Sequence, residues 1–323
     1  MTGVGRWLSR WGGRAQGPRE AGPAPAPAPA PAPVPAPAPV IAAGAGAYWD
    51  QQATGAPSVY WAEHTLVRES VNRWITGEPG LWPIDALRGR WLPRSFALGL
   101  SIGCGTGSLE RCLRRVGSCE RLDAFDLSAA SIREARRLAA EEGIEGIEYR
   151  VEDCDELRLA PRRYDIVFFH HSLHHIADPD RLLDETRSAL KDGGYLYLDE
   201  YVGPSRDEWT EETLRWAREA YEAVDPRLRS RPLAPPIEPD DPSEMIRSSR
   251  ILPAVRERFE IVLFRPYWGN LLFPLFCALD GAALLAEDRR ELVASLVGRE
   301  RELVESGALR DPLFAVVLAR SRA

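Results

Sequence analysis

The sequence has few cysteines, a single lysine and no long uninterrupted hydrophobic run. Its five cysteines are an odd number and contain no CxxC pair, which argues against a disulfide framework or a zinc-ribbon site and favours a reducing, cytoplasmic setting. The most apolar stretch, residues 271–286, is too short to span a bilayer and contains Pro274 and Asp280. We therefore expect no transmembrane segment and interpret this stretch as core or pocket lining.

Residues 1–47 are predicted to be a disordered Ala/Pro-rich tail. Nine of the 27 prolines lie in residues 23–39, and each one removes a backbone donor and fixes φ, which produces an extended spacer. The first residues include Trp7 and Trp11 but lack the apolar region of a secretory signal. A short interfacial helix that contacts a membrane surface or a partner remains an alternative to a disordered tail.

The charge balance disfavours nucleic-acid partners. The chain carries a net charge of −7, and residues 1–47 contain four arginines and one glutamate, so the remainder is near −10 by subtraction. Nucleic-acid binding normally requires a basic domain or stripe. An acidic body instead favours a small or uncharged partner.

From residue 97 onward, short apolar runs alternate with helical periods, which predicts an α/β fold with a Rossmann-like, doubly wound and mostly parallel sheet. We expect residues 48–96 to form an N-terminal helical lid and residues 97–323 to form the main domain. Insertions at residues 203–250 and 267–310, largely helical, are expected after the fifth and sixth strands. The expected strands are residues 97–102, a run ending at 126, and residues 148–151, 166–169, 195–198, 261–264 and 313–318.

Helix-capping residues are predicted for the segment between the fourth and fifth strands. Asp178 is expected to cap this helix, with Pro179 at its first position. Gly193 and Gly194 are expected to terminate it, because glycine accommodates the left-handed conformation of a helix end.

A glycine-rich turn follows the first expected strand. Gly103, Gly105 and Gly107 allow a tight turn and close approach of a ligand to the backbone, and Asp126 ends the next strand, where its carboxylate can accept both hydroxyls of a ribose. A dinucleotide fingerprint, G-x-G-x-x-G, would require glycine where Ser108 stands. The pattern therefore predicts a nucleoside site and argues against a nicotinamide cofactor.

Four ordered blocks resemble class I S-adenosylmethionine-dependent methyltransferases with a small-molecule, type 11/12-like domain. They read LSIGCGTGSLER, FDLSAASIREAR, VEDCDEL and YDIVFFHHSLHHIADPDRLLDETRSALKDGGYLYLDEY, and they cover roughly residues 97–201. The resemblance implies that S-adenosyl-L-methionine is the cofactor and that the cofactor-binding residues are Ser101, Gly103, Cys104, Gly105, Gly107, Asp126, Leu127, Asp153, Cys154 and His170. In this scheme the glycines border the methionine part, Asp126 holds the ribose and Asp153 accepts from the adenine amino group.

The sequence departs from the family at Ser101, where the family often has an acidic residue. Backbone carbonyls, water or another carboxylate must then contact the cofactor's ammonium group. Glu110 is a candidate for this contact; alternatively it is a solvated helix residue.

Catalytic candidates gather after the fourth and fifth strands. Histidine takes a proton from a hydroxyl near neutral pH, so His174 or His175 is a candidate general base, unless these residues only tie the loop to the backbone. Glu200 and Tyr201 are candidates to orient an acceptor hydroxyl or amine; alternatively they anchor the turn that follows.

The histidines also raise the question of a metal. His170 with His174, and His171 with His175, have helical spacing, but neither pair has a third ligand in the H-E-x-x-H style, so the sequence predicts no metal site.

The predicted function is therefore a methyltransferase acting on a hydroxyl of a small molecule, a sugar or glycan, or a lipid-linked acceptor. No D/N-P-P-Y tetrapeptide follows the fourth strand, which removes the usual arrangement for methylating amino groups of bases. Tyr60 and Trp61 are candidates for the pocket, and Trp268 and residues 271–273 for its opposite wall. Two alternatives stay open: an NAD(P)-dependent oxidoreductase, and a non-catalytic protein that binds S-adenosylmethionine. The oligomeric state is not predicted.

Overall fold

The computed structural model describes residues 40–53, 60–92 and 95–322. The described residues belong to one compact unit. Residues 1–39 of the predicted tail lie outside the described residues. Helix α2 covers Val40–Gln52, so the predicted tail boundary at residue 47 is wrong. The proline repeat ends at Pro39, and nothing after it prevents the alanine-rich segment from forming a helix.

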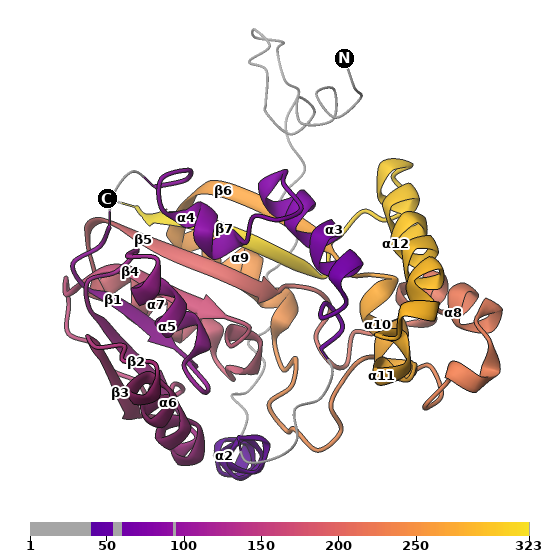
Figure 1. The fold of residues 1–323 in the computed structure, drawn as a ribbon. Helices are drawn as coiled ribbons and strands as arrows, with labels where there is room; N and C mark the ends of the chain where they lie inside the picture. The colour runs from indigo at the N-terminus through magenta and orange to yellow at the C-terminus, as the bar shows by residue number, and fades with distance from the viewer. Residues whose placement is uncertain (1–39, 54–59, 93–94, 323) are drawn as a thin grey trace, which may run out of the picture. The chain divides into compact units, whose positions relative to one another are not determined.

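The described part of the chain contains one seven-stranded sheet with the strand order β3-β2-β1-β4-β5-β7-β6 (Figure 1). Its first five strands are parallel, and β7 lies antiparallel between β5 and β6. The prediction of a doubly wound, mostly parallel α/β sheet is thereby confirmed. The strands are β1 (Gly99–Ile102), β2 (Leu122–Asp126), β3 (Ile147–Val151), β4 (Tyr164–His170), β5 (Leu190–Tyr201), β6 (Phe259–Trp268) and β7 (Phe314–Ser321).

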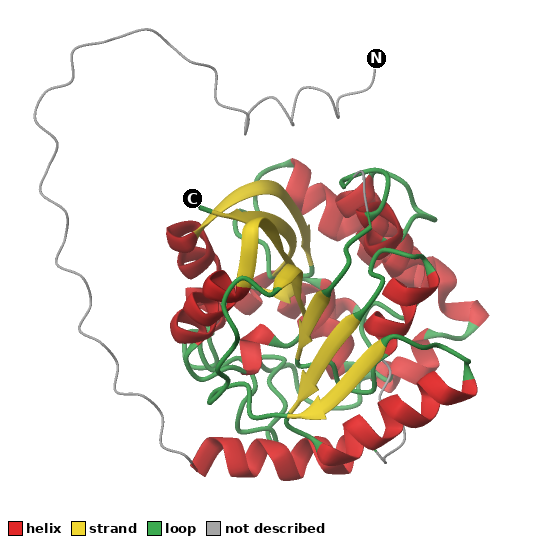
Figure 2. Ribbon diagram, turned by 90° about the vertical axis from the view of Figure 1, so that its left-hand side faces the viewer, coloured by secondary structure: helices red, strands yellow, loops and turns green. Residues whose placement is uncertain are grey.

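Helices pack on both faces of the sheet, as Figure 2 shows for the strands between surrounding helices. In β4, Ile166 and Phe168 pack into one buried cluster, and Val167 and Phe169 pack into another. This arrangement explains why the strand is apolar at every central position. The helices that accompany the sheet are α3 (Thr65–Thr76), α4 (Pro83–Leu87), α5 (Ser108–Arg115), α6 (Ala129–Glu141), α7 (Pro179–Ala189) and α9 (Ser248–Arg258).

The start of α7 is as predicted, but its end is not. The Asp178 side chain accepts a hydrogen bond from the Arg181 N–H and caps the helix. The helix ends at Ala189, and both Gly193 and Gly194 lie within β5, so the predicted terminator is wrong. The chain leaves the helix early because Leu190 already pairs with Tyr164 of β4.

The two insertions supply α8 (Glu211–Ala223), α10 (Leu272–Ala278), α11 (Gly281–Leu284) and α12 (Arg290–Glu305). Helix α10 contacts both α8 and α12, and α12 contacts α3. Leu271, Leu272 and Leu275 are buried in the main core cluster, which confirms that the apolar stretch is core. Among the described residues, no helix has the length and apolarity needed to cross a membrane.

A buried carboxylate fixes the start of α10. Glu300 of α12 is 5 % exposed, and its Oε1 accepts hydrogen bonds from the Leu271 N–H at 2.8 Å and the Leu272 N–H at 3.1 Å. Burial raises the pKa of Glu300 to about 7. Because the folded protein holds a proton on this group that the unfolded chain has already released, stability falls as the pH rises from 4.5 to 7.

We expect Glu300→Gln to remove this pH dependence. Glutamine keeps an oxygen for the two N–H groups but does not ionise. Between pH 4.5 and pH 7 the free energy of unfolding of wild type should fall by about 3 kcal/mol relative to that of the variant. Urea unfolding at pH 5, 6 and 7 measures it, and parallel curves for the two proteins would contradict the assignment.

Candidate active site

A cavity of about 400 Å³ lies at the carboxyl ends of β1, β2 and β4. Its lining comes from the loop after β1, the ends of β2 and β4, residues 153–155 and helix α2. Ligands in open α/β sheets bind at this edge, and cavities of about 300–1,000 Å³ are usual for small-molecule sites. We therefore take this cavity as the candidate active site.

The glycine loop adopts backbone that side chains rarely allow. Gly103, Gly105 and Gly107 all have positive φ, at 73°, 53° and 77°. A Cβ on Gly103 would overlap the Ser172 side chain, and one on Gly107 would overlap the Tyr149 ring. The loop is therefore pressed against neighbouring segments while its backbone lines the cavity.

Asp126 stands at the end of β2 with its carboxylate at the cavity. Its Oδ2 accepts from the Gly105 N–H at 2.7 Å, and its Oδ1 accepts from the Ser128 N–H at 2.8 Å. Burial raises the pKa of Asp126, while these two N–H groups favour the ionised form. Each oxygen retains a lone pair, so the carboxylate can still accept from two hydroxyl groups of a ligand.

Most of the predicted cofactor residues meet at the cavity. The lining includes Gly103, Cys104, Gly105, Asp126, Leu127, Asp153, Cys154 and His170. Ser101 and Gly107 are not part of the lining. Glu110 is fully buried, so its interpretation as a solvated residue is wrong, and burial raises its pKa to about 7.

Two free cysteines border the cavity. Cys104 lies in the glycine loop, and Cys154, which is 6 % exposed, follows β3. Burial raises the pKa of both thiols well above the ordinary value. Both side chains are therefore protonated at neutral pH.

Helix α2 also lines the cavity, through Ala45, Trp49 and Gln52, as does Ala53 directly after it. It is fastened to the start of α6 by Asp50, whose Oδ1 accepts from the Ser128 hydroxyl at 2.6 Å and the Ala130 N–H at 2.8 Å. The sequence prediction placed the first half of this helix in the tail and missed its contribution. No local motif marks these residues; the absence of proline from residues 40–56 is the only available signal.

Of the predicted catalytic residues, His174 and Glu200 form a buried pair. His174 Nδ1 is hydrogen bonded to Glu200 Oε1, and Glu200 Oε2 accepts from the Ser172 N–H at 2.9 Å and the Leu173 N–H at 2.7 Å. Burial lowers the pKa of His174 to about 4. Neither side chain belongs to the cavity lining. Glu200 holds in place the segment of residues 171–175 after β4, which we call the histidine loop.

His175 does line the cavity. Its Nδ1 lies 3.2 Å from the Ser243 hydroxyl and 3.3 Å from Asp241 Oδ2, and the Ser243 hydroxyl donates to Asp241 Oδ1 at 2.6 Å. Asp241 is fully buried. The sequence reasoning missed Asp241 and Ser243, because they come from the insertion after β5 and carry no motif.

Tyr201 takes the anchoring role that was the alternative to catalysis. Its hydroxyl donates to the Pro204 carbonyl at 2.9 Å, and the residue is 1 % exposed.

The predicted aromatic wall lies outside the cavity lining. Trp61 is buried and stacks on Phe314 with ring centroids 5.2 Å apart, whereas Tyr60 is 45 % exposed and contacts His171 edge to face. Trp268 and residues 271–273 pack in or against the main core cluster.

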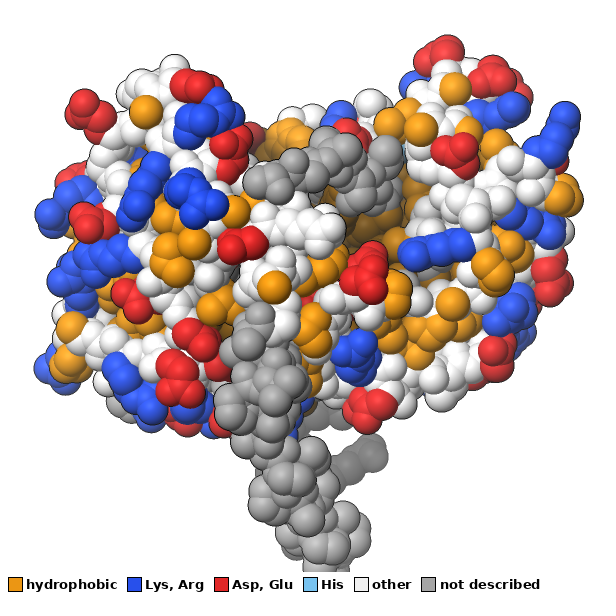
Figure 3. Space-filling model, turned by 90° about the horizontal axis from the view of Figure 1, so that it is seen from below, with side chains coloured by type: hydrophobic (Ala, Val, Ile, Leu, Met, Phe, Trp, Pro, Cys, Tyr) orange, Lys and Arg blue, Asp and Glu red, His pale blue; other side chains and the backbone are white. Residues whose placement is uncertain are grey.

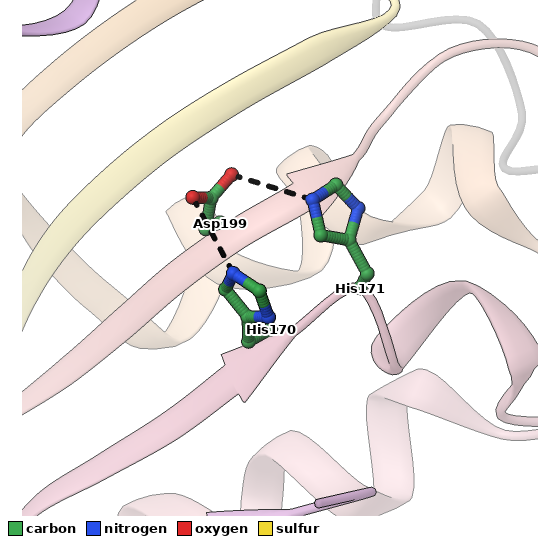
Figure 4. A group of neighbouring side chains, drawn as sticks. All are labelled: His170, His171 and Asp199. Carbon is green, nitrogen blue, oxygen red and sulfur yellow. Dashed lines mark ion pairs between the residues drawn. The ribbon is translucent and has the colours of Figure 1, made fainter. Parts of the chain in front are cut away.

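A second set of histidines meets a carboxylate from β5. His170 Nε2 lies 3.9 Å from Asp199 Oδ2, and His171 Nε2 lies 3.9 Å from Asp199 Oδ1. Figure 4 shows both rings directed toward this carboxylate from β4 and the residue after it. The Tyr267 hydroxyl donates to Asp199 Oδ1 at 2.8 Å. The neighbouring strand thus places a carboxylate beside two adjacent histidines, a grouping that the sequence spacing did not indicate.

Comparison with known proteins finds relatives of the part of the chain that runs from β1 into β5. Residues 100–198 match the family model described as "Methyltransferase domain", which confirms the resemblance seen in the sequence. A "Ubiquinone biosynthesis O-methyltransferase" of Xanthomonas euvesicatoria pv. vesicatoria (strain 85-10) is 30% identical over 135 residues, which is 39% of this chain and 55% of that protein. A protein of the same name from Parvibaculum lavamentivorans is 33% identical over 99 residues, covering 31% of this chain and 38% of that protein.

The chain spans about half the length, or less, of these curated relatives. Among solved structures, the N-methyltransferase NodS from Bradyrhizobium japonicum WM9, in complex with S-adenosyl-l-homocysteine, aligns with a TM-score of 0.49 and 11% identity. That alignment covers 87% of this chain and 100% of NodS.

Proposed function

Since residues 100–198 form a methyltransferase domain of the class I, S-adenosylmethionine-dependent family, we propose that this chain transfers a methyl group from S-adenosylmethionine to a hydroxyl oxygen of a small molecule. The observation that carries the proposal is the cavity that joins the glycine loop and the Asp126 carboxylate to His175. When bound, S-adenosylmethionine supplies an electrophilic methyl group. The protein has to hold the donor and align the acceptor.

The residues around the cavity fit this cofactor. The Asp126 carboxylate has two free lone pairs for a ribose diol, and the backbone of the glycine loop lies open beside it. Leu127 offers an apolar contact for adenine, and Asp153 offers an acceptor for its amino group. His170, at the end of β4, borders the other side. Ser101 and Gly107 contribute by shaping the loop, since neither lines the cavity.

An oxygen acceptor agrees with three features. The relatives are named O-methyltransferases. Four histidines, which can take up the proton of a hydroxyl group, lie in residues 170–175. The face that carries α2 has acidic and basic side chains interspersed with hydrophobic ones, as Figure 3 shows, which suits a small or partly apolar acceptor better than a polyanion. A sugar, a phenol or a lipid-linked hydroxyl compound belongs to the proposed class.

His175 is the general base in this proposal, and Asp241 orients it. If His175 Nδ1–H faces the Asp241 carboxylate and the Ser243 hydroxyl, the ring nitrogen Nε2 is left to accept a proton. His174 is less suitable, because its Nδ1 is held by Glu200 and its ring lies outside the cavity lining. We place Glu200 as a positioning residue for the histidine loop.

We expect His175→Ala to lower turnover by about 10²–10⁴-fold while the affinity for S-adenosylhomocysteine changes little. Asp241→Asn should lower turnover less, because the ring stays in place with a weaker partner. Transfer of labelled methyl from S-adenosylmethionine to a panel of phenols and sugars measures the rate, and calorimetry measures the affinity. His64→Asn, at the start of α3, is the control. Loss of S-adenosylhomocysteine binding in His175→Ala would reject the base role.

Two other functions are separated by the same experiments. A heat signal with NADH and none with S-adenosylmethionine would favour an oxidoreductase. Binding of S-adenosylmethionine without transfer to any acceptor would favour a non-catalytic binding protein. We keep the cytoplasm as the proposed compartment, because all five cysteines are free.

A further inference from the structure

The carboxylate of Asp199 has no positively charged partner of the usual kind. It is 8 % exposed, and among the described residues it makes no ion pair with an arginine or a lysine. Its neighbours are the Nε2 atoms of His170 and His171 at 3.9 Å and the hydroxyl of Tyr267 at 2.8 Å. A buried carboxylate normally requires a paired charge or a full set of donors.

The two histidine distances are too long for hydrogen bonds and close to those of ligands that share a metal ion. In an N–H···O hydrogen bond, the nitrogen and the accepting oxygen are about 2.7–3.2 Å apart. Two ligands that each lie about 2.1 Å from a tetrahedral zinc ion are about 3.4 Å apart. The three ligand atoms all lie within 4.8 Å of one another. Each nitrogen faces a different carboxylate oxygen, so one shared ion would lie against both oxygens, with each nitrogen–oxygen distance shorter by about half an ångström.

The backbone supports the same arrangement. His171 has a φ of 52°, a left-handed conformation that is uncommon for residues other than glycine and clusters at functional sites. Its N–H donates to the Asp199 carbonyl at 2.8 Å, which fixes the residue beside β5. As a result, both imidazoles converge on one carboxylate (Figure 4), although adjacent residues of an extended strand point to opposite faces.

The surrounding groups prepare these side chains as ligands. The Tyr267 hydroxyl holds Asp199 in the way that outer hydrogen bonds hold the ligands of metal sites.

We propose that His170, His171 and Asp199 bind one divalent transition-metal cation at the edge of the cavity. Two imidazoles and one carboxylate form a ligand set typical of zinc and iron(II) sites that keep open positions. His170 and His171 line the cavity, so the open positions face the acceptor. If the proposed methyl transfer is correct, the cation takes an acceptor oxygen as a ligand and lowers the pKa of its hydroxyl group.

A second group, His174, His175 and Glu244, also meets the distance condition. We favour the Asp199 group, because neither of its two Nε2 atoms makes a hydrogen bond within the described part of the chain. In the second group, His174 Nδ1 is bonded to Glu200, and His175 Nδ1 lies beside Ser243 and Asp241.

The test is a titration of the full chain, freed of metal by a chelator, with Co²⁺ alone. Visible absorption follows the filling of the site. One equivalent should bind with the absorption of a low-coordinate nitrogen and oxygen site. His170→Ala and Asp199→Asn should each weaken Co²⁺ binding by about tenfold or more. His64→Asn and Asp192→Asn, changes at a distant helix cap and at the exposed start of β5, are the matched controls and should bind Co²⁺ like wild type.

Three results would overturn the proposal. The first is that wild type fails to bind Co²⁺ stoichiometrically, and the second is that both ligand variants bind it as wild type does. The third is that Glu244→Gln loses binding while His170→Ala keeps it, which would move the ion to the second group. Each variant is first shown to be folded by circular dichroism. Titration of the same metal-free protein with S-adenosylhomocysteine reports separately on the proposed function, since the Asp126 carboxylate and the glycine loop, which are proposed to hold the cofactor, are not metal ligands.

Discussion

Asp126→Ala should abolish measurable binding of S-adenosylmethionine and S-adenosylhomocysteine while the protein remains folded. The carboxylate is the acceptor proposed for both ribose hydroxyls, and hydrogen bonds to a charged group contribute about 1.5–3 kcal/mol each. Two of them correspond to a loss of about 10²–10⁴-fold in affinity. The variant also frees the Gly105 N–H, which Asp126 Oδ2 holds at 2.7 Å, so the loop loses part of its orientation.

Calorimetric titration with S-adenosylhomocysteine measures this effect. Asp126→Asn should fall between wild type and alanine, because its amide keeps one acceptor oxygen. The matched control is Asp123→Asn on the same strand, whose carboxylate binds Arg163 and Tyr164 away from the cavity. That variant should lose stability and retain affinity. An Asp126→Ala protein that binds within about threefold of wild type would show that the ribose lies elsewhere.

Gly103→Ala should destabilise the protein by about 3 kcal/mol, the sum of backbone strain at positive φ and a steric clash. Gly103 has a φ of 73°, and an added Cβ would overlap both Cβ and Oγ of Ser172. Ser172 cannot retreat easily, because its hydroxyl donates to the Ile102 carbonyl at 2.7 Å and its N–H is held by Glu200. The change therefore presses on the histidine loop as well as on the glycine loop.

Gly143→Ala is the control that isolates the clash. Gly143 follows α6 with a φ of 65°, and a Cβ there would meet nothing within 4 Å. Gly143→Ala should lower the free energy of unfolding only by the backbone strain, about 1 kcal/mol. Urea unfolding measures the stability of both variants. The rate of methyl transfer by Gly103→Ala should fall by more than the unfolded fraction of that variant accounts for. Equal destabilisation of the two variants would mean that the contact with Ser172 does not matter.

The sheet and the cofactor side could be predicted from the sequence because their signals are local. The alternation of strands and helices, the positive-φ glycines and an acid at the next strand end all lie within short segments. β4 was recognisable because a strand covered on both faces has no polar alternation. The end of α7 was not, because its position depends on pairing between Leu190 and Tyr164 across the sheet.

The acceptor side was less predictable, since its residues meet only through the tertiary fold. Asp199 stands beside His170 because β5 pairs with β4, and Asp241 reaches His175 from an insertion of irregular structure. Neither carboxylate lies close to the histidines along the sequence, so residue spacing gave no sign of them. Helix α2 was missed for the same reason, because the hydrogen bonds of Asp50 to the start of α6 join segments far apart in the sequence.

The protonated state of Cys104 and Cys154 has a consequence for the lifetime of the enzyme. A thiolate is a stronger nucleophile than most methyl acceptors, and both sulfur atoms border the cavity proposed for an electrophilic methyl donor. If the proposed function holds, ionised cysteines there would be open to alkylation by bound S-adenosylmethionine. Burial raises the pKa of both thiols and so disfavours the ionised form beside the proposed donor.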